Sequence, residues 1–308
     1  MSRPGGKFFL INAAFAPATQ KKYRKAVDDF LSWTEREGLD SSDPFKFDEI
    51  ITLYLHDMFA SGDGGKGKAQ DTIYGILSFL PELKGHLPMS NLALTGWKKL
   101  QPTVSYPPLT FELATAVAVK MAFSGHWSAG VAVLLGFDCL LRIGELTSLR
   151  REDVADAKDA RVSSTFRGMA LRLVKTKTGP NQWVEVSDRR IQRLVRVLLS
   201  SSRGKTVFGL SAHKFRQVFK DTCADLGLSP AYVPHSLRHG GATHLHLRGV
   251  SIEDILLRGR WASTKSARRY VQSGRAMLLS MDIPPLLVPL LPFLSQRFHS
   301  LFSLAQSH

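Results

Sequence analysis

The chain has 308 residues, of which 44% are hydrophobic, and its formal net charge of +15 corresponds to a pI near 10.0. This length allows two packed domains, and the composition is too polar for an integral membrane protein. The positive charge favours a polyanionic partner, with nucleic acid ahead of an anionic membrane, over a surface that is merely basic.

The N-terminal residues 1–17 are expected to form a flexible arm rather than a secretion signal, because their apolar stretch is short and is interrupted by Asn12. From Thr19 to Glu37 apolar side chains recur at helical spacing, and Gly38 ends the pattern. The opposite face of this predicted helix carries four basic residues that we expect to contact DNA: Lys21, Lys22, Arg24 and Lys25.

Further helices are predicted at about 46–60, 69–80 and 90–101, so residues 18–101 are expected to form an all-helical domain. The glycine-rich segment 62–67 nearly completes the phosphate-binding pattern GxxxxGK[ST]. However, Ala69 lacks the hydroxyl that this pattern requires for magnesium, and a helix rather than a strand precedes the segment. We interpret it as a flexible loop whose Lys66 and Lys68 contact DNA phosphates.

Three prolines mark residues 102–109 as a stiff linker, and residues 110–280 are expected to form the second domain. Two strand-like runs, Ala170–Val174 and Gln182–Val186, flank a turn and predict a β-hairpin. The predicted fold class is therefore mainly α with a small β-hairpin, an α+β domain. Its helices are expected at about 110–122, 127–140, 143–149, 188–201, 211–226, 236–248, 251–258 and 264–273.

Most of the excess positive charge lies in this second part of the chain. Residues 1–102 carry 13 Lys and Arg against 12 Asp and Glu, and the remainder carries 28 against 14. The only cysteines, Cys139 and Cys223, form no CxxC pattern and are expected to be buried, reduced thiols. We expect an intracellular, DNA-associated protein, in the nucleus of a eukaryote or in the cytoplasm and nucleoid of a prokaryote.

Four spaced residues of the second domain have the chemistry needed to attack a phosphodiester: Arg142, His235, Arg238 and Tyr270. Two guanidinium groups can stabilise the negative charge that builds up on the non-bridging oxygens in the transition state. A tyrosine hydroxyl is a weak nucleophile until a base takes its proton, and His235 could be that base.

Two neighbours could support this chemistry. Glu145 lies three residues after Arg142 on the same helical face, so its carboxylate can hold the guanidinium in one pose. Trp261 lies nine residues before Tyr270, and its indole N–H can donate to a phosphate oxygen at any pH. Taken singly, such an ion pair is usually a surface pair, and such aromatic residues usually pack in a core.

Three histidines crowd the segment after His235: His239, His244 and His246. They have no cysteine or acidic partner at ligand spacing, so we expect neither a metal site nor a cofactor. His239 lies one turn from His235 and could tune its protonation.

As a set, these residues resemble the tyrosine recombinase (phage integrase) family, which includes lambda-type integrases, Xer recombinases and Cre. The resemblance covers about residues 20–275. The family's Leu-Arg-x-x-Glu/Asp-Leu context is matched at 141–146, and its His-x-Leu-Arg-His box is matched at 235–239. The His or Trp nine residues before the family's tyrosine is matched by Trp261, the residue type found in Cre.

The family's catalytic lysine lies in the β-hairpin. Lys177 matches its Lys-Thr-Gly pattern, and Lys175 lies two residues earlier. Because side chains alternate along a strand, both lysines can point the same way. We assign Lys177 as the catalytic lysine and keep Lys175 as the alternative and as a further DNA contact.

The resemblance implies a two-domain, C-shaped clamp around double-stranded DNA, with residues 18–101 as the core-binding domain. It also implies that Tyr270 attacks the phosphodiester, forming a 3′-phosphotyrosine bond and releasing a 5′-hydroxyl without metal or ATP. Arg142 and Arg238 would clamp the phosphate, and Lys177 would protonate the leaving oxygen. His235 would assist proton transfer, while Trp261, Glu145 and His239 would support the site.

In the family four protomers on two DNA sites perform the exchange, so we expect a homotetramer on DNA and a monomer or weak dimer when free. The function expected is site-specific recombination, as in a mobile element. The alternatives are a 3′-linking tyrosine topoisomerase and a non-catalytic DNA-binding remnant of the same fold. The apolar, proline-rich tail over residues 281–308 is too short and too broken to span a bilayer, and either docks on a neighbouring protomer or is weakly packed.

Overall fold

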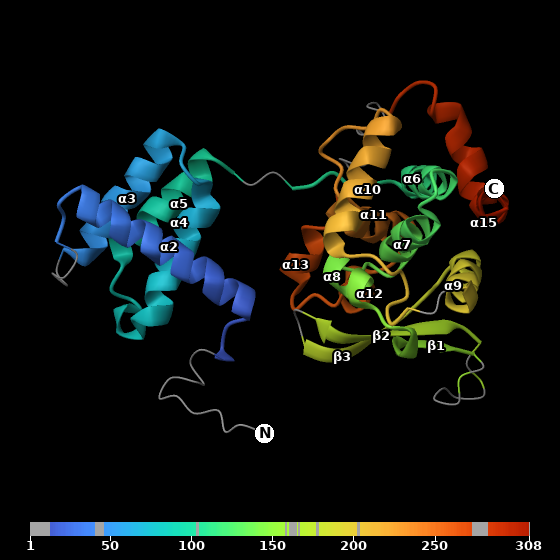
Figure 1. Ribbon diagram of the computed structural model, residues 1–308, viewed down its shortest axis with the longest axis horizontal. Coiled ribbons are helices and arrows are strands. Elements are labelled where there is room, and N and C mark those ends of the chain that lie inside the picture. Colours follow the sequence, from blue (N-terminus) through green and yellow to red (C-terminus); the bar gives the residue numbers. More distant parts are fainter. Residues whose placement is uncertain are drawn as a thin grey trace. The chain divides into compact units, whose positions relative to one another are not determined.

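The computed structural model describes residues 13–40, 46–102, 105–157, 159, 165, 167–176, 179–201, 204–272 and 283–307. The chain divides into two compact units, residues 1–104 and residues 105–308 (Figure 1). Each unit has its own hydrophobic core. As predicted, the protein is mainly helical with one small antiparallel sheet.

The first unit is built from helices that pack in pairs, α2 on α4 and α3 on α5. Its core contains the fully buried Phe30, Ile51 and Ile73. Gly75 of α4 lies directly against α2, since a Cβ at this position would come within 2.9 Å of the Tyr23 carbonyl oxygen. Its elements are α2 (Pro17–Arg36), α3 (Phe47–Ser61), α4 (Gly65–Phe79), the 3-10 helix η1 (Pro81–Leu83) and α5 (Pro88–Leu100).

The glycine-rich segment is more ordered than the sequence suggested. Helix α4 begins at Gly65, four residues before the predicted start, so Lys66 and Lys68 lie in its first turn rather than in a flexible loop. Gly62 and Gly64 adopt φ angles of 73° and 85°, which glycine tolerates because it has no Cβ. With these conformations residues 62–64 are enough to connect α3 to α4. The predicted flexible loop over 62–67 is therefore wrong, because its second half belongs to α4.

The second unit surrounds α7, a helix that is apolar and buried on nearly every side. Helix α7 packs against α6, α9 and α11, and α15 packs against α6. Ser and Thr side chains cap several helices, for example Thr110, which accepts a hydrogen bond from the Leu113 amide at the start of α6. The helices are α6 (Phe111–Phe123), α7 (Trp127–Asp138), α8 (Ile143–Ser148), α9 (Arg189–Ser201), α10 (Ala212–Asp225), α11 (Pro234–Leu247), α12 (Ile252–Gly259), α13 (Thr264–Arg268) and α15 (Leu291–Gln306), with 3-10 helices η2 (Arg151–Asp153) and η4 (Val288–Leu290).

The predicted hairpin is confirmed and belongs to a three-stranded antiparallel sheet in the order β1-β2-β3. The strands are β1 (Val154–Asp156), β2 (Met169–Thr176) and β3 (Gly179–Glu185). Leu171 of β2 stands opposite Val154 on one side and Val184 on the other, and all three side chains are buried. Strand β1 was not predicted, because three residues are too few to show an alternating pattern.

The described part of the tail is neither weakly packed nor directed away from its own unit. Helix α15 places the fully buried Phe298 and Phe302 in the core of the second unit. The Trp127 indole donates a hydrogen bond to the Phe302 carbonyl oxygen at 2.9 Å. A Cβ at Gly130 would come within 2.9 Å of the Phe302 ring, so α7 and α15 pack closely at this point.

Both cysteines are buried and carry free thiols, as predicted. Burial raises the pKa of each thiol, that of Cys223 to about 12, so both stay protonated near neutral pH. None of the helices in the described residues has the length and hydropathy needed to cross a bilayer. Within the same residues, no three His, Cys, Asp or Glu side chains are grouped as metal ligands.

Candidate active site

Helix α11 places His235 beside Tyr270. Pro234 occupies the first turn of α11, where a missing N–H costs nothing, and His235 follows it. The His235 Nε2 atom lies 3.2 Å from the Tyr270 hydroxyl. Burial, and then the charges of Arg238 and Arg142, lower the pKa of His235, so its imidazole is neutral near pH 7. A neutral imidazole at this distance can accept the tyrosine proton.

Arg238, one turn further along α11, is fully buried. Its two terminal nitrogens donate hydrogen bonds to the carbonyl oxygens of Leu140 and Gly259. Its guanidinium carbon lies 4.3 Å from the centre of the Trp261 ring and 5.4 Å from that of Tyr270. Burial and the nearby guanidinium groups lower the pKa of Arg238. In this arrangement two aromatic rings cover the cation that was predicted to clamp a phosphate.

Arg142 is the more accessible of the two predicted arginines, with 23% of its side chain exposed. It is the N-cap of α8, and its backbone N–H donates to Glu145 Oε2 at 2.9 Å while its Nη1 donates to Oε1 at 2.6 Å. The predicted contact between the carboxylate and the guanidinium is therefore present. It is made at the cap of α8 and not along one helical face, because the Arg142 backbone is extended. The pair is largely buried on the glutamate side, where Glu145 is 5% exposed.

A second arginine, Arg260, binds the same carboxylate. Its Nη2 donates to Glu145 Oε2 at 3.0 Å, and Arg260 is only 7% exposed. Burial alone would raise the pKa of Glu145, but Arg260 and Arg142 outweigh it and hold that pKa below its usual value. We did not predict Arg260, because it lies in a run rich in arginine and lysine where no spacing sets it apart.

Trp261 is in the site but turned inward. Its indole Nε1 is buried without a hydrogen-bond partner among the described residues. The ring lies on Gly259, where a Cβ would come within 1.9 Å of it, and its centre is 4.6 Å from that of Tyr270. Only glycine at position 259 therefore allows the indole to take this place.

Tyr270 follows α13 in a turn rather than lying inside a helix, because α13 ends at Arg268 instead of extending to residue 273. The half-buried ring stacks on His239, with 4.4 Å between ring centres and 22° between ring planes. His239 in turn lies with its Nδ1 atom 2.9 Å from Gln272 Nε2. The residues predicted from spacing that the structure describes are thus brought together around the tyrosine: Arg142, Glu145, His235, Arg238, His239, Trp261 and Tyr270.

The model of the Phage integrase family matches residues 116–276, which is more than half of the chain and spans this whole cluster. The chain belongs to the phage integrase family. A search of the curated proteins found no match to the sequence.

Solved structures of integrases and recombinases share the fold of this family member. A lambda integrase dimer bound to a COC′ core site has a TM-score of 0.59 at 15% identity, covering 86% of this chain and 74% of that one. The Tn1549 transposon integrase in complex with transposon right end DNA has a TM-score of 0.61 at 12% identity, covering 85% and 99%. XerH recombinase bound to a palindromic difH substrate has a TM-score of 0.52 at 12% identity, covering 78% and 71%.

Of the two hairpin lysines of this family member, the structure describes Lys175. Lys177, the predicted catalytic lysine, lies outside the described residues. Lys175 is exposed on β2, opposite Pro180 of β3, and lines a pocket of about 350 Å³ together with Glu145 and Arg172. Lys175 therefore faces the space next to the Arg142–Glu145 pair.

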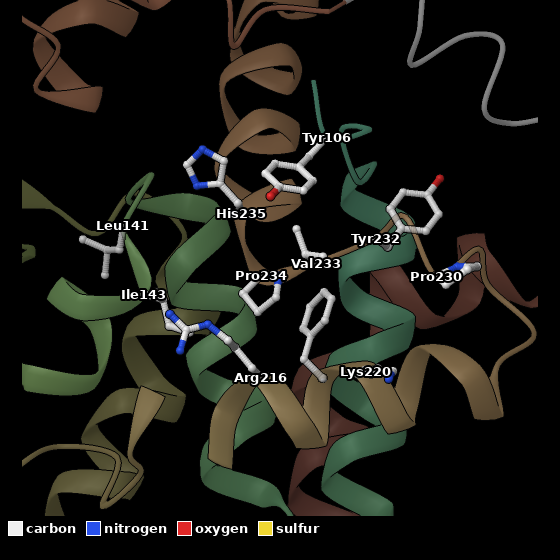
Figure 2. A pocket seen from close by; sticks show the side chains of 11 residues that line it. Tyr106, Leu141, Ile143, Arg216, Lys220, Pro230, Tyr232, Val233, Pro234 and His235 are labelled. Carbon is white, nitrogen blue, oxygen red and sulfur yellow. The ribbon is translucent and has the colours of Figure 1, made fainter. Parts of the chain in front are cut away.

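A larger pocket, of about 580 Å³, opens beside His235. Figure 2 shows the rings of His235 and Tyr106 at one end of it, with Arg216 and Lys220 of α10 at the other. The centres of the two rings are 5.8 Å apart. Both basic side chains are exposed, so this pocket offers positive charge next to the candidate site.

The basic residues predicted to contact DNA in the first unit fall into two groups. On α2 the side chains of Lys21, Lys22, Arg24 and Lys25 are exposed and lie on one helix. The two lysines of α4 instead have partners within the chain. Lys66 donates a hydrogen bond to the Gln101 carbonyl oxygen, and Lys68 pairs with Asp29 at 3.2 Å and Asp63 at 3.5 Å. A DNA contact by either lysine would compete with these interactions.

Proposed function

We propose that the chain is a site-specific DNA recombinase that cleaves and rejoins DNA through a covalent 3′-phosphotyrosine intermediate on Tyr270. One observation carries the proposal. The Tyr270 hydroxyl lies 3.2 Å from the neutral His235 imidazole, in a cluster with the guanidinium groups of Arg142 and Arg238. Membership of the phage integrase family supports the same chemistry.

In the proposed cleavage, His235 takes the phenolic proton as the Tyr270 oxygen attacks phosphorus. The bond from phosphorus to the 5′-oxygen breaks, and Lys177 donates a proton to that oxygen. Arg142 and Arg238 stabilise the charge on the non-bridging oxygens. Attack by the 5′-hydroxyl of another strand reverses these steps, so the phosphodiester energy is conserved in the phosphotyrosine bond and no ATP is consumed.

Two buried N–H donors next to the tyrosine are suited to bind a phosphate oxygen. Nε of Arg238 and Nε1 of Trp261 have no hydrogen-bond partner among the described residues. A buried polar group without a partner costs about 1–3 kcal/mol, and such groups commonly mark a functional site. A phosphate oxygen would satisfy both donors once the rings of Trp261 and Tyr270 move off the guanidinium. We infer that DNA binding brings about this movement.

The parts of the chain take the roles that the family suggests. We assign residues 1–17 as an arm, 18–101 as the core-binding domain, 102–109 as the linker and 110–280 as the catalytic domain, to whose core the tail, 281–308, contributes helix α15. The two domains would close around double-stranded DNA, with four protomers on two sites. The exposed basic face of α2 and the cations beside the large pocket supply phosphate contacts.

Covalent trapping tests the proposal. The full chain is incubated with a pool of nicked duplexes of randomised sequence, in which the cleaved strand end diffuses away, and SDS-stable adducts are isolated and sequenced. The parent should form adducts and Tyr270→Phe should form none. Tyr74→Phe is a matched control, since that tyrosine is exposed on α4 in the first unit and should be neutral. Adducts formed equally well by Tyr270→Phe would reject the nucleophile.

The recombinase and the two alternative functions differ in what they do to the duplexes recovered from the adducts. Joining of two separate duplexes indicates a recombinase, and relaxation of supercoiled DNA without joining indicates a topoisomerase. Binding of DNA without any adduct would indicate a non-catalytic remnant. The burial of Arg238 is the observation that bears on this alternative, because a fully buried guanidinium does not contact DNA.

A substrate with sulfur in place of the bridging 5′-oxygen tests the lysine assignment. Thiolate leaves without protonation, so this substrate should restore cleavage to a variant that lacks the general acid. We expect Lys177→Ala to cleave the ordinary substrate poorly and the sulfur-containing substrate well. Lys175→Ala should cleave both substrates nearly as well as the parent does. The opposite pattern would make Lys175 the acid.

A further inference from the structure

Arg260 adopts a backbone conformation that arginine rarely takes. Its φ and ψ angles are 55° and 46°, in the left-handed region, where it ends helix α12. Glycine is the residue normally found at such a helix end, because a Cβ is disfavoured there. Arg260 is also 7% exposed, so both its backbone and its cation are in costly environments. Contacts made by the side chain must offset that cost.

One of those contacts is local, a hydrogen bond to the Arg258 carbonyl oxygen at 2.9 Å, and the other three reach the segment that carries Arg142. The Arg260 guanidinium donates to the carbonyl oxygens of Cys139 at 3.3 Å and Leu140 at 3.0 Å, and to Glu145 at 3.0 Å. Leu140 itself has a positive φ of 50°, which turns the chain between α7 and α8. Its carbonyl oxygen also accepts a hydrogen bond from Arg238. One side chain therefore connects the end of α12 to the turn that precedes Arg142.

Glu145 is the link between Arg260 and Arg142. Its Oε2 accepts from Arg260 and from the Arg142 backbone N–H, and its Oε1 accepts from the Arg142 guanidinium. Arg142 holds one carboxylate oxygen through its backbone N–H and the other through its guanidinium, and Arg260 adds a third contact at Oε2. Loss of Arg260 removes this contact and its charge, so the carboxylate and the Arg142 guanidinium bound to it gain freedom to shift.

We propose that Arg260 is a positioning residue for DNA cleavage, which acts through Glu145 to hold the Arg142 guanidinium in the orientation that receives the phosphate. This inference rests on the proposed function. An ordinary core ion pair would account for burial and charge, but it would not require this residue at a left-handed position. Arg260 touches neither Tyr270 nor His235 through any hydrogen bond of the described residues, so its effect is indirect.

Arg260→Gly isolates the side chain from the backbone, because glycine suits a φ of 55°. On a nicked duplex recovered by trapping, the single-turnover rate of adduct formation at saturating DNA should fall by about tenfold to a hundredfold, the range expected from a small displacement of a catalytic group. The dissociation constant for the same duplex should be unchanged. A merely structural role would weaken binding and cleavage together, and a rate equal to that of the parent would overturn the proposal.

A double-mutant cycle with Glu145→Gln tests the route. If Arg260 acts through Glu145, adding Arg260→Gly to Glu145→Gln should change the rate little, whereas additive losses would overturn the route. Should Arg260→Gly melt far below the parent, Arg260→Asn takes its place, since asparagine tolerates a left-handed backbone and brings no positive charge to Glu145.

Arg196→Ala is the matched control. Arg196 lies on α9, outside the site, and its Nε pairs with Asp156 of β1 at 2.6 Å, so this variant should cleave at the rate of the parent. These outcomes are separable from failure of the proposed function. If the parent forms no adduct, the recombinase proposal fails first. If the parent forms adducts and Arg260→Gly matches it, only the inference about Arg260 fails.

Discussion

Replacing Phe302 with alanine tests whether helix α15 belongs to the core of the catalytic unit. The Phe302 ring is fully buried and packs edge-on against Trp127, with 5.5 Å between ring centres. Transfer of a phenylalanine side chain out of a core costs about 1.5–3 kcal/mol, and the cavity left behind raises the loss to about 3–5 kcal/mol. Gly130 has no side chain that could fill the cavity, and α7 lies closely against α6 there, since a Cβ at Gly130 would come within 2.4 Å of the Ala118 carbonyl oxygen. We therefore expect the upper part of this range.

Urea unfolding of the full chain, followed by far-UV circular dichroism and tryptophan fluorescence, measures this loss. With a slope of about 2 kcal/mol/M, a loss in the upper part of that range should lower the midpoint for the second unit by about 2–2.5 M. Leu304→Ala lies on the same helix but is 55% exposed in the parent, so its effect should stay within about 0.5 kcal/mol. Equal midpoints for the two variants would refute the assignment of α15 to the core.

The other predictions concern the pH dependence and the close packing of the site. Because burial and two arginines lower the pKa of His235, adduct formation should be complete above its usual pKa of about 6.5 and fall only as the pH drops below that value. His235→Gln should abolish this decline, and an acid limb centred above 6.5 in the parent would contradict the assignment. Gly240→Ala should lower the melting temperature markedly, since its Cβ would lie 1.9 Å from the Leu109 carbonyl oxygen. Gly144→Ala, with nothing within 4 Å of its Cβ, should not, and scanning calorimetry compares the two.

The helices of both units could be predicted because their signals are local. Apolar spacing and a following glycine place α2, and an apolar run with a capping Thr110 places α6. Helix α15 in the tail was not predicted, because the prolines of residues 284–292 argue against a helix. Pro292 in fact occupies the first turn of α15, where proline is tolerated, and the rest of the helix is held by contacts with α6.

The candidate site shows the same division. Residue types and spacing, taken together with the family resemblance, predicted Arg142, His235, Arg238 and Tyr270 as site residues, because the chemistry of a phosphodiester attack restricts the residue types that can serve it. Spacing could not show that Arg238 lies beneath two aromatic rings, nor that the predicted helix around Tyr270 ends before it. These features depend on how α11, α12 and α13 pack.

Residue types and their order along the chain were thus enough to indicate the family and the mainly helical fold, and they predict the chemistry of the site. The tertiary structure decided which cations are accessible, which carboxylate is held on two sides, and that Arg260 takes part at all. The physical reason is that the hydrogen bonds at Leu140 and Glu145 join residues 98 to 120 positions apart in the sequence. Arg238 and Arg260 donate there to the same Leu140 carbonyl oxygen. Local patterns record the propensity of neighbours, and they carry no information about such long-range contacts.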